Sequence, residues 1–406
     1  MANFIKSNKE LISKCYLVIL VVSALLFQTV VYRCTYDFEG DEWILLWKMT
    51  PWTLVPMLAS TLLAAYYTDK GYGKTVGIIG LFLLLGSAVI MSGSMLWASM
   101  SYRETKVIWT HLSGYPVRAF LAVFLIANSF MRGGAIAILL SMLSDVRKSA
   151  KRAVTIRVMI ISAIVTCILV LLNLIIRFQL TWPLIALGGS IIVVMAIPAI
   201  FCLKSMECEP EDEVLVSCEK DKGWIMPTAI FALCILTIIS YWQYVPNSWR
   251  YYHIGTKTLH YMSMIISMAT FAICLWIPQK RARKNGILIG AILLLLGLPL
   301  GAMMMDEGFL FDIIPMVFIG IGMAMIIKPT MEAFITLPVK MYSLTWVGII
   351  TVVILICKLV LIMFNRMEVA LHTRSVAEYI IYPLVTIALI IMGYQSVSQD
   401  KNQSIS

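Results

Sequence analysis

Four charged side chains stand inside long apolar stretches of the sequence, where a charge is costly. They are Arg132, Lys328, Glu332 and Lys358. An ionisable residue in an apolar segment of membrane length marks, by default, a substrate pathway, a proton relay or an ion pair. Three of the four are cations and one is an acid, so a cavity that held all four would carry a net positive charge. This balance favours an anionic or zwitterionic substrate over a lipophilic cation.

Each of these charges also has a structural interpretation. Arg132 could line a cavity, or it could hold helices together through backbone carbonyls. Lys328 and Glu332 are four residues apart and would share one face of a helix, where they could neutralise each other. Alternatively, protonation of Glu332 would release Lys328 for an anionic ligand and so couple the two binding events. Lys358 has no acidic neighbour within its own segment and needs a partner, water or an anionic substrate.

Uncharged polar and aromatic residues add weaker candidates for substrate binding. Gln28 and Gln243 occupy similar late positions in the first and seventh apolar stretches. Tyr241 lies close to Gln243 and could stack on an organic solute. Aromatic residues at the end of a span more often form the belt at the membrane surface, so both interpretations stay open for Tyr241.

Several other kinds of site have no motif in this sequence. There is no Gly-x-x-x-x-Gly-Lys-Ser/Thr loop for nucleotide phosphates, no His-Glu-x-x-His zinc motif and no Gly-x-Ser-x-Gly nucleophile motif. The 9 cysteines form no Cys-x-x-Cys pair. We therefore expect no metal, no cofactor and no enzymatic activity. A membrane enzyme acting on lipids is the weaker alternative, since the longest exterior loop, residues 101–116, offers few reactive side chains.

The composition of the chain indicates which elements must hold these residues. Of 406 residues, 60% are apolar and 13% are charged, and the mean hydropathy is +0.89. Soluble domains are about one quarter charged, so the natural solvent for this chain is lipid. A window of about 20 residues, the length that crosses a bilayer, predicts twelve spanning helices. Their predicted ranges are 15–32, 44–68, 76–100, 117–143, 154–176, 181–203, 225–247, 258–277, 286–305, 309–336, 343–364 and 377–395.

The distribution of Lys and Arg predicts the orientation of these spans. Loops and termini on the side of the N-terminus, where Lys14 precedes the first span, carry about twice as many basic residues as those on the opposite side. Both termini are therefore expected in the cytoplasm, and the membrane is expected to be a bacterial inner membrane. The formal charge of +10 could suggest nucleic acid binding in a soluble protein. Beside membrane helices, basic clusters are topology signals, and we expect no nucleic acid partner.

A polar segment divides the chain into two similar parts. Residues 204–223 are rich in Asp and Glu and too polar to fold alone, so they are predicted to be a cytoplasmic linker. Residues 1–203 and 224–406 then hold six predicted spans each. In both parts a basic loop follows the second span and the fourth span has a basic end. Two six-helix bundles related by pseudo-symmetry are a known transporter plan.

The loop after the second predicted span carries a recognisable pattern. It reads Ala65-Tyr66-Tyr67-Thr68-Asp69-Lys70-Gly71-Tyr72-Gly73-Lys74. Together with the six-plus-six layout, it resembles the loop signature of the major facilitator superfamily, although Ala65 stands where glycine is usual. The resemblance implies an all-α membrane fold of twelve helices and alternating access. It also implies a gating role for this loop, in which Asp69 accepts hydrogen bonds from a neighbouring helix and Gly73 permits a tight turn between Lys70 and Lys74.

Further positions fit this resemblance. Arg132 lies mid-span in the fourth predicted helix, where many drug–proton antiporters of the superfamily carry a membrane arginine. Asp145 ends the same helix beside Arg147, which suggests a gate or loop pairing. The family plan also places the spans that hold Gln28 and Gln243 at a central cavity.

Secondary active transport is the function that the sequence predicts. We expect a small anionic or zwitterionic solute to cross the membrane by alternating access, with Glu332 as the proton site if transport is proton-coupled. A multidrug–proton efflux antiporter is the alternative within the same fold. The expected partners are a small-molecule substrate, membrane lipid and protons, and the expected state is a monomer.

Overall fold

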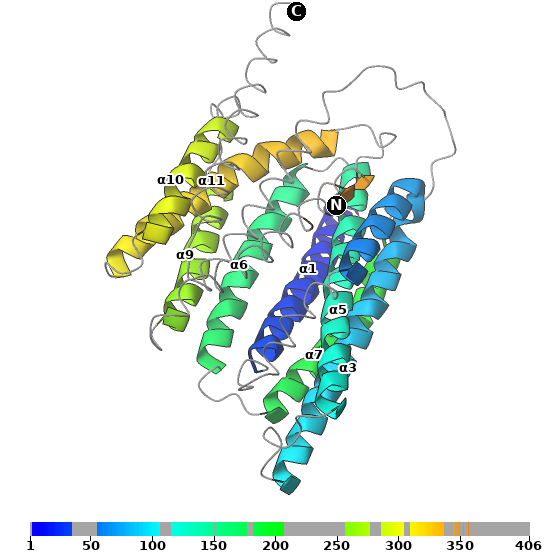
Figure 1. Ribbon diagram of the computed structural model, residues 1–406. Coiled ribbons are helices and arrows are strands. Elements are labelled where there is room, and N and C mark those ends of the chain that lie inside the picture. Colours follow the sequence, from blue (N-terminus) through cyan, green and yellow to red (C-terminus); the bar gives the residue numbers. More distant parts are fainter. Residues whose placement is uncertain are drawn as a thin grey trace, which may run out of the picture. The chain divides into compact units, whose positions relative to one another are not determined.

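The computed structural model describes residues 2–34, 55–105, 115–149, 152–176, 182–206, 256–276, 286–303 and 309–336, with a few positions between 344 and 356. Every element of this described part is helical (Figure 1). The elements are α1 (Ala2–Cys34), a helix at residues 55–67, the π-helical turn η2 (Thr68–Tyr72), α3 (Gly73–Thr105), α5 (Tyr115–Ser149), α6 (Arg152–Ile176), α7 (Trp182–Lys204), α9 (Thr256–Trp276), α10 (Gly286–Met303) and α11 (Phe309–Thr336).

These helices coincide with the predicted spans wherever the structure describes them. On length and composition, four stretches of the described residues could each cross a membrane: Lys9–Gln28, Val55–Ser94, Leu125–Val146 and Leu187–Lys204. The stretch Val55–Ser94 has 40 residues, which in one straight helix would extend about 60 Å, twice the hydrocarbon core, so it holds two spans. The predicted spans 225–247 and 377–395 lie outside the described residues, and 343–364 lies largely outside them.

The outer surfaces of the helices are apolar, like their packed faces. Phe201 and Trp276 are mostly exposed, whereas Leu17 and Leu81 are fully buried. A helix that is apolar all round is typical of a membrane span, because lipid tails accept the exposed side chains that water would not.

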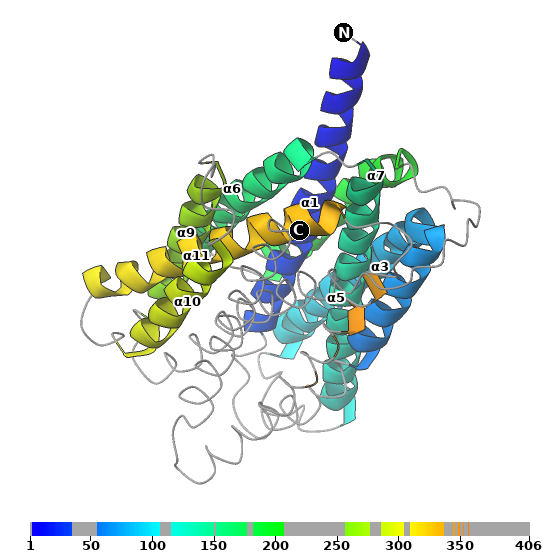
Figure 2. The same cartoon turned by 90° about the horizontal axis from the view of Figure 1, so that it is seen from above.

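The described helices group into two compact units. Unit 1 comprises Met1–Ser149 with Leu172–Glu213, and unit 2 comprises Ala150–Leu171 with Val214–Ser406. In unit 1, α5 and α7 each pack against both α1 and α3 (Figure 1). In unit 2, α11 packs against α9 and α10 (Figure 2). The greater part of α6 groups with unit 2, where Cys167 Sγ donates to Ile265 O of α9 at 3.7 Å. The division into six spans, a linker at 204–223 and six further spans stays a prediction.

Glycines bring the helices of unit 1 together backbone to backbone. A Cβ added at Gly80 on α3 would lie 2.8 Å from Gly134 O on α5, and one at Gly134 would lie 2.9 Å from Leu84 N. A Cβ at Gly133 would collide with Ser60 of the helix at 55–67. Small residues let membrane helices approach closely, which is a main source of their association in lipid. Two neighbours therefore hold α5 in a fixed position.

Unit 2 contains a crossing of the same kind. A Cβ at Gly290 on α10 would lie 2.7 Å from Gly322 O on α11, and one at Gly322 would lie 2.8 Å from Gly290 O. A Cβ at Gly320 would collide with the backbone of Ser267 on α9. The glycines of α11 thus fix it against two neighbours, as those of α5 do.

A tight turn joins the helix at 55–67 to α3. Gly71 in η2 has φ 91° and ψ −3°, a conformation that glycine adopts without the strain a Cβ would add. We predicted that Gly73 would permit this turn, and that prediction is wrong. Gly73 is helical, with φ −53° and ψ −39°, because α3 already begins there and the chain must turn before it.

Candidate functional site

Arg132 on α5 is surrounded by amide side chains. Asn128 precedes it by four residues and so lies one turn away on the same helix face. Gln28 reaches both residues from α1. One end of the Gln28 amide lies 2.6 Å from Arg132 Nε and 3.2 Å from Arg132 Nη2, and the same end is hydrogen-bonded to Asn128. We name these three residues the amide–arginine cluster.

Donor chemistry determines how the Gln28 amide is oriented. A guanidinium has N–H donors only, so the end of Gln28 that faces Arg132 is the oxygen, Oε1. This oxygen accepts from Nε and Nη2, the edge of the guanidinium that can hold a carboxylate in a bidentate pair. The Asn128 amide contacts the same end of Gln28. Two guanidinium donors therefore converge on one oxygen position beside the Asn128 amide.

The amide–arginine cluster is buried within unit 1. Gln28 is 3% exposed and Asn128 is 7% exposed, while Arg132 is partly exposed. Gly133 and Gly134 follow Arg132 directly, so the tight packing of α5 against its neighbours sets the direction in which the guanidinium points. The structure thus brings together two predicted binding residues, Gln28 and Arg132. Asn128 was not predicted, although its four-residue spacing from Arg132 was a usable signal.

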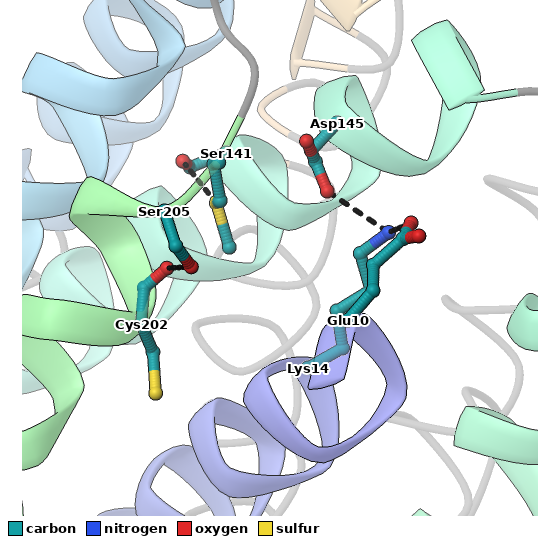
Figure 3. A network of polar contacts seen from close by, with 7 residues as sticks. Glu10, Lys14, Ser141, Asp145, Cys202 and Ser205 are labelled. Carbon is teal, nitrogen blue, oxygen red and sulfur yellow. Dashed lines mark hydrogen bonds and ion pairs between the residues drawn. The ribbon is translucent and has the colours of Figure 1, made fainter. Parts of the chain in front are cut away.

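A second polar network joins the first part of α1 to the end of α5 (Figure 3). Lys14 Nζ lies 2.7 Å from Glu10 Oε1 and 2.9 Å from Asp145 Oδ2. Lys14 is only 1% exposed, and a buried ammonium needs carboxylates nearby to offset its lost hydration. The sequence suggested a gate or loop pairing for Asp145 beside Arg147 and treated Lys14 only as a topology signal. Arg147 lies on α5, and its side chain is outside the described part.

The end of α7 is attached to the same region of α5. Ser141 Oγ, one turn before Asp145, donates to Met206 Sδ at 3.7 Å, and Ser205 Oγ donates to Cys202 O at 2.8 Å (Figure 3). The first of these bonds crosses from α5 to the residues just after α7. The start of the predicted linker is therefore anchored to unit 1.

The predicted gating loop carries an aromatic cluster. Lys70 Nζ lies 4.7 Å from the ring centroid of Tyr66, within cation–π range. Tyr67 makes edge contacts with Tyr66 and Tyr72, with ring centroids 5.5 Å and 6.3 Å apart. The gating roles of Asp69, Lys70 and Lys74 stay predictions, whereas the turn predicted for Gly73 is made by Gly71.

In unit 2, the described part of α11 includes Lys328. Its Nζ donates to Leu275 O of α9 at 3.3 Å. The helix continues through Glu332, so the two residues lie one turn apart on one face, as their spacing predicted. The Glu332 side chain lies outside the described part, as do three other predicted site residues: Lys358, Gln243 and Tyr241.

The fold of the chain is similar to that of solved transporter structures. No protein-family model and no curated protein matches the chain. The solved structures similar to it include XylE, the proton:xylose symporter of the major facilitator superfamily, bound to 6-bromo-6-deoxy-D-glucose. The TM-score is 0.69 and the identity 13%, over 98% of this chain and 96% of that chain. A bacterial homologue of the iron transporter ferroportin, in an outward-facing state with soaked iron, gives a TM-score of 0.63 and 10% identity over 97% and 98% of the two chains.

Both likenesses extend over nearly the whole length of each chain. The fold class predicted from the sequence, an all-α membrane protein built like a major facilitator, is confirmed. The chain is a multi-pass membrane protein with the fold of the major facilitator superfamily.

Proposed function

We propose that the chain is a secondary transporter that moves a small anionic or zwitterionic organic solute across the membrane by alternating access. The observation that carries the proposal is Arg132, a guanidinium on a membrane helix whose Nε and Nη2 face one oxygen position, filled by the Gln28 amide. The fold supports the transport class, since the similar solved structures are a proton symporter and a homologue of an iron transporter.

The guanidinium of Arg132 favours a substrate with a carboxylate or phosphate group. Such a charge is costly inside a membrane and is placed there for an ion pathway, a ligand or a partner. A guanidinium binds carboxylate and phosphate through two parallel N–H···O bonds, which supplies both affinity and orientation. Lys328 and Lys358 would add positive potential to the substrate pathway in this proposal.

Glu332 is the proton site in the proposed mechanism. Its protonation would remove a negative charge one helical turn from Lys328, and the ammonium would then favour an anion more strongly. Proton and anion would bind together and cross together. In this proposal the monomer is the working unit, both termini are cytoplasmic, and the membrane is a bacterial inner membrane.

Transport by the purified protein in liposomes tests the proposal. Uptake and efflux would be measured for succinate, L-glutamate, xylose, ferrous iron and tetraphenylphosphonium, with and without an imposed pH gradient. Iron is included because of the ferroportin likeness, although no three His, Cys, Asp or Glu side chains gather into a metal site among the described residues. We expect transport of a carboxylate. Transport of tetraphenylphosphonium or iron without any carboxylate would overturn the proposed substrate class.

Variants of the charged residues sharpen this test. Arg132→Ala should lower kcat/KM for the anion by about 30-fold, since truncating one partner of a desolvated charge interaction costs about 2 kcal/mol or more. Arg157→Ala, at an exposed arginine of α6, is the matched control and should leave transport unchanged. Glu332→Gln should abolish accumulation driven by the pH gradient while retaining exchange. If Arg132→Ala, Lys358→Ala and Glu332→Gln each left transport unchanged, the proposal would be overturned.

A further inference from the structure

We infer that Gln28 is a neutral placeholder in an oxyanion site, and that the anionic group of the substrate displaces it. The inference rests on the proposed function, because it concerns how Arg132 takes its substrate. Gln28 Oε1 already occupies the position that a carboxylate oxygen would take, 2.6 Å from Arg132 Nε and 3.2 Å from Arg132 Nη2.

The geometry makes Gln28 and an anion competitors for the same edge of the guanidinium. A carboxylate that pairs with Nε and Nη2 cannot do so while Oε1 of Gln28 fills the position. Hydrogen bonds from a guanidinium to a charged oxygen are about twice as strong as bonds between neutral groups. Exchange of the amide for a carboxylate is therefore favourable, and without substrate the amide keeps the arginine hydrogen-bonded.

Asn128 is a positioning residue in this exchange. It is buried one turn before Arg132 and is hydrogen-bonded to Gln28. Its side-chain amide borders the position at which the two guanidinium donors converge. An oxygen that replaced Gln28 Oε1 would receive the two charged N–H donors of Arg132, and in this proposal the Asn128 amide turns its Nδ2 toward that oxygen as a third donor, an arrangement that stabilises oxyanions.

A purely structural role for Gln28 makes the opposite prediction. If the amide only ties α1 to α5, any substitution at position 28 should weaken the protein and its binding of anions alike. If the amide is a placeholder, removing its oxygen should strengthen anion binding, whereas replacing it with a permanent carboxylate should block the site.

Two substitutions at this position separate the alternatives. Gln28→Ala removes the competing oxygen, and Gln28→Glu inserts a carboxylate of nearly the same shape. Binding of succinate, L-glutamate and inorganic phosphate to the purified full-length protein would be measured from the rise in its thermal-unfolding midpoint with ligand concentration. For the anions that the wild type binds, we expect the apparent Kd to fall about tenfold in Gln28→Ala and to rise at least about tenfold in Gln28→Glu.

Matched variants control this experiment. Tyr16→Phe removes another side-chain hydrogen bond of α1, from Tyr16 Oη to Met195 O at 2.6 Å, and should leave the Kd unchanged. Asn128→Leu should weaken anion binding about tenfold in both the wild-type and the Gln28→Ala backgrounds. Should Gln28→Ala fail to fold, Gln28→Met keeps the side-chain volume without the amide oxygen and carries the same prediction.

The possible outcomes distinguish this inference from the proposed function. Weaker anion binding in both Gln28→Ala and Gln28→Glu would overturn the placeholder and leave the proposed transport of anions standing. An absence of anion binding in the wild type and in Gln28→Ala, with transport of a neutral or cationic solute in liposomes, would overturn the proposed substrate class and the placeholder with it.

Discussion

The crossing of α3 with α5 in unit 1 can be compared with the crossing of α10 with α11 in unit 2. The first brings Gly80 to the backbone of Gly134, and the second brings Gly290 to the backbone of Gly322. In the predicted order of spans, each pair joins the third and fourth helices of its half. In both, a further glycine of the fourth helix contacts the second helix, so the packing plan is repeated.

The polar residues on the two fourth helices differ. In unit 1, α5 carries Arg132 and Asp145, whose contacts include Gln28 and Lys14 of α1. In unit 2, the side chains described on α11 include the cation Lys328, which contacts a backbone carbonyl of α9. Glycine spacing thus sets the scaffold that the two units share, whereas the polar residues differ between them and must be interpreted one by one.

The largest expected effect comes from breaking the α1–α5 network of unit 1. Lys14→Met removes a buried ammonium and leaves Glu10 and Asp145 without it, so it should lower the free energy of unfolding by about 3–5 kcal/mol. The measurement is thermal unfolding of the purified protein in detergent, together with the yield of folded protein. Lys14→Arg keeps the charge and should retain most of the stability. A Lys14→Met protein as stable as the wild type would show that the network contributes nothing.

Substitutions at the glycine crossings should have intermediate effects, of similar size in the two units. Gly134→Ala and Gly322→Ala each force a methyl group against a neighbouring backbone, which typically costs about 1–3 kcal/mol in a packed interior. Thermal unfolding again reports the change.

A matched control for the crossings lies on α3. A Cβ at Gly86 or Gly93 has no atom within 4 Å, so alanine there should be neutral or stabilising by up to about 1 kcal/mol. A large loss for Gly134→Ala with none for Gly322→Ala would contradict the repeated packing plan.

The smallest expected effect is that of Lys328→Met in unit 2. Its hydrogen bond to a carbonyl is long at 3.3 Å, and its loss should cost about 1 kcal/mol. The same Lys→Met change in the two units thus compares the α1–α5 network directly with the α9–α11 contact. If Lys328→Met proves as destabilising as Lys14→Met, α11 carries a charge network of equal weight and the contrast between the units disappears.

The positions of the helices could be predicted from the sequence because lipid imposes them locally. The predicted span 309–336 has the bounds of α11 itself, and 154–176 lies within α6. The turn at Gly71 could not be assigned in this way, since either glycine of Gly71-Tyr72-Gly73 could supply the positive φ. Backbone geometry, and not composition, decides between them.

Candidate site residues could be predicted one by one, but their pairings could not. Arg132 stood out because a charge in an apolar run is costly. Gln28 was predicted separately, and no periodicity relates it to a residue 104 positions away. The role of Lys14 was also missed, because a basic residue before the first span is normally a topology signal. Only the packing of α1 against α5 places it beside Asp145.

The turn at Gly71 also bears on how the chain enters the membrane. The stretch Val55–Ser94 is long and apolar enough for two spans, and only the five residues of η2 separate its two helices. Because the connection is this short, one helix cannot cross the bilayer while the other stays far from the membrane. The two helices should therefore enter the bilayer together as one hairpin during synthesis, with Lys70 and Lys74 near its tip, on the side that the distribution of basic residues predicts to be cytoplasmic.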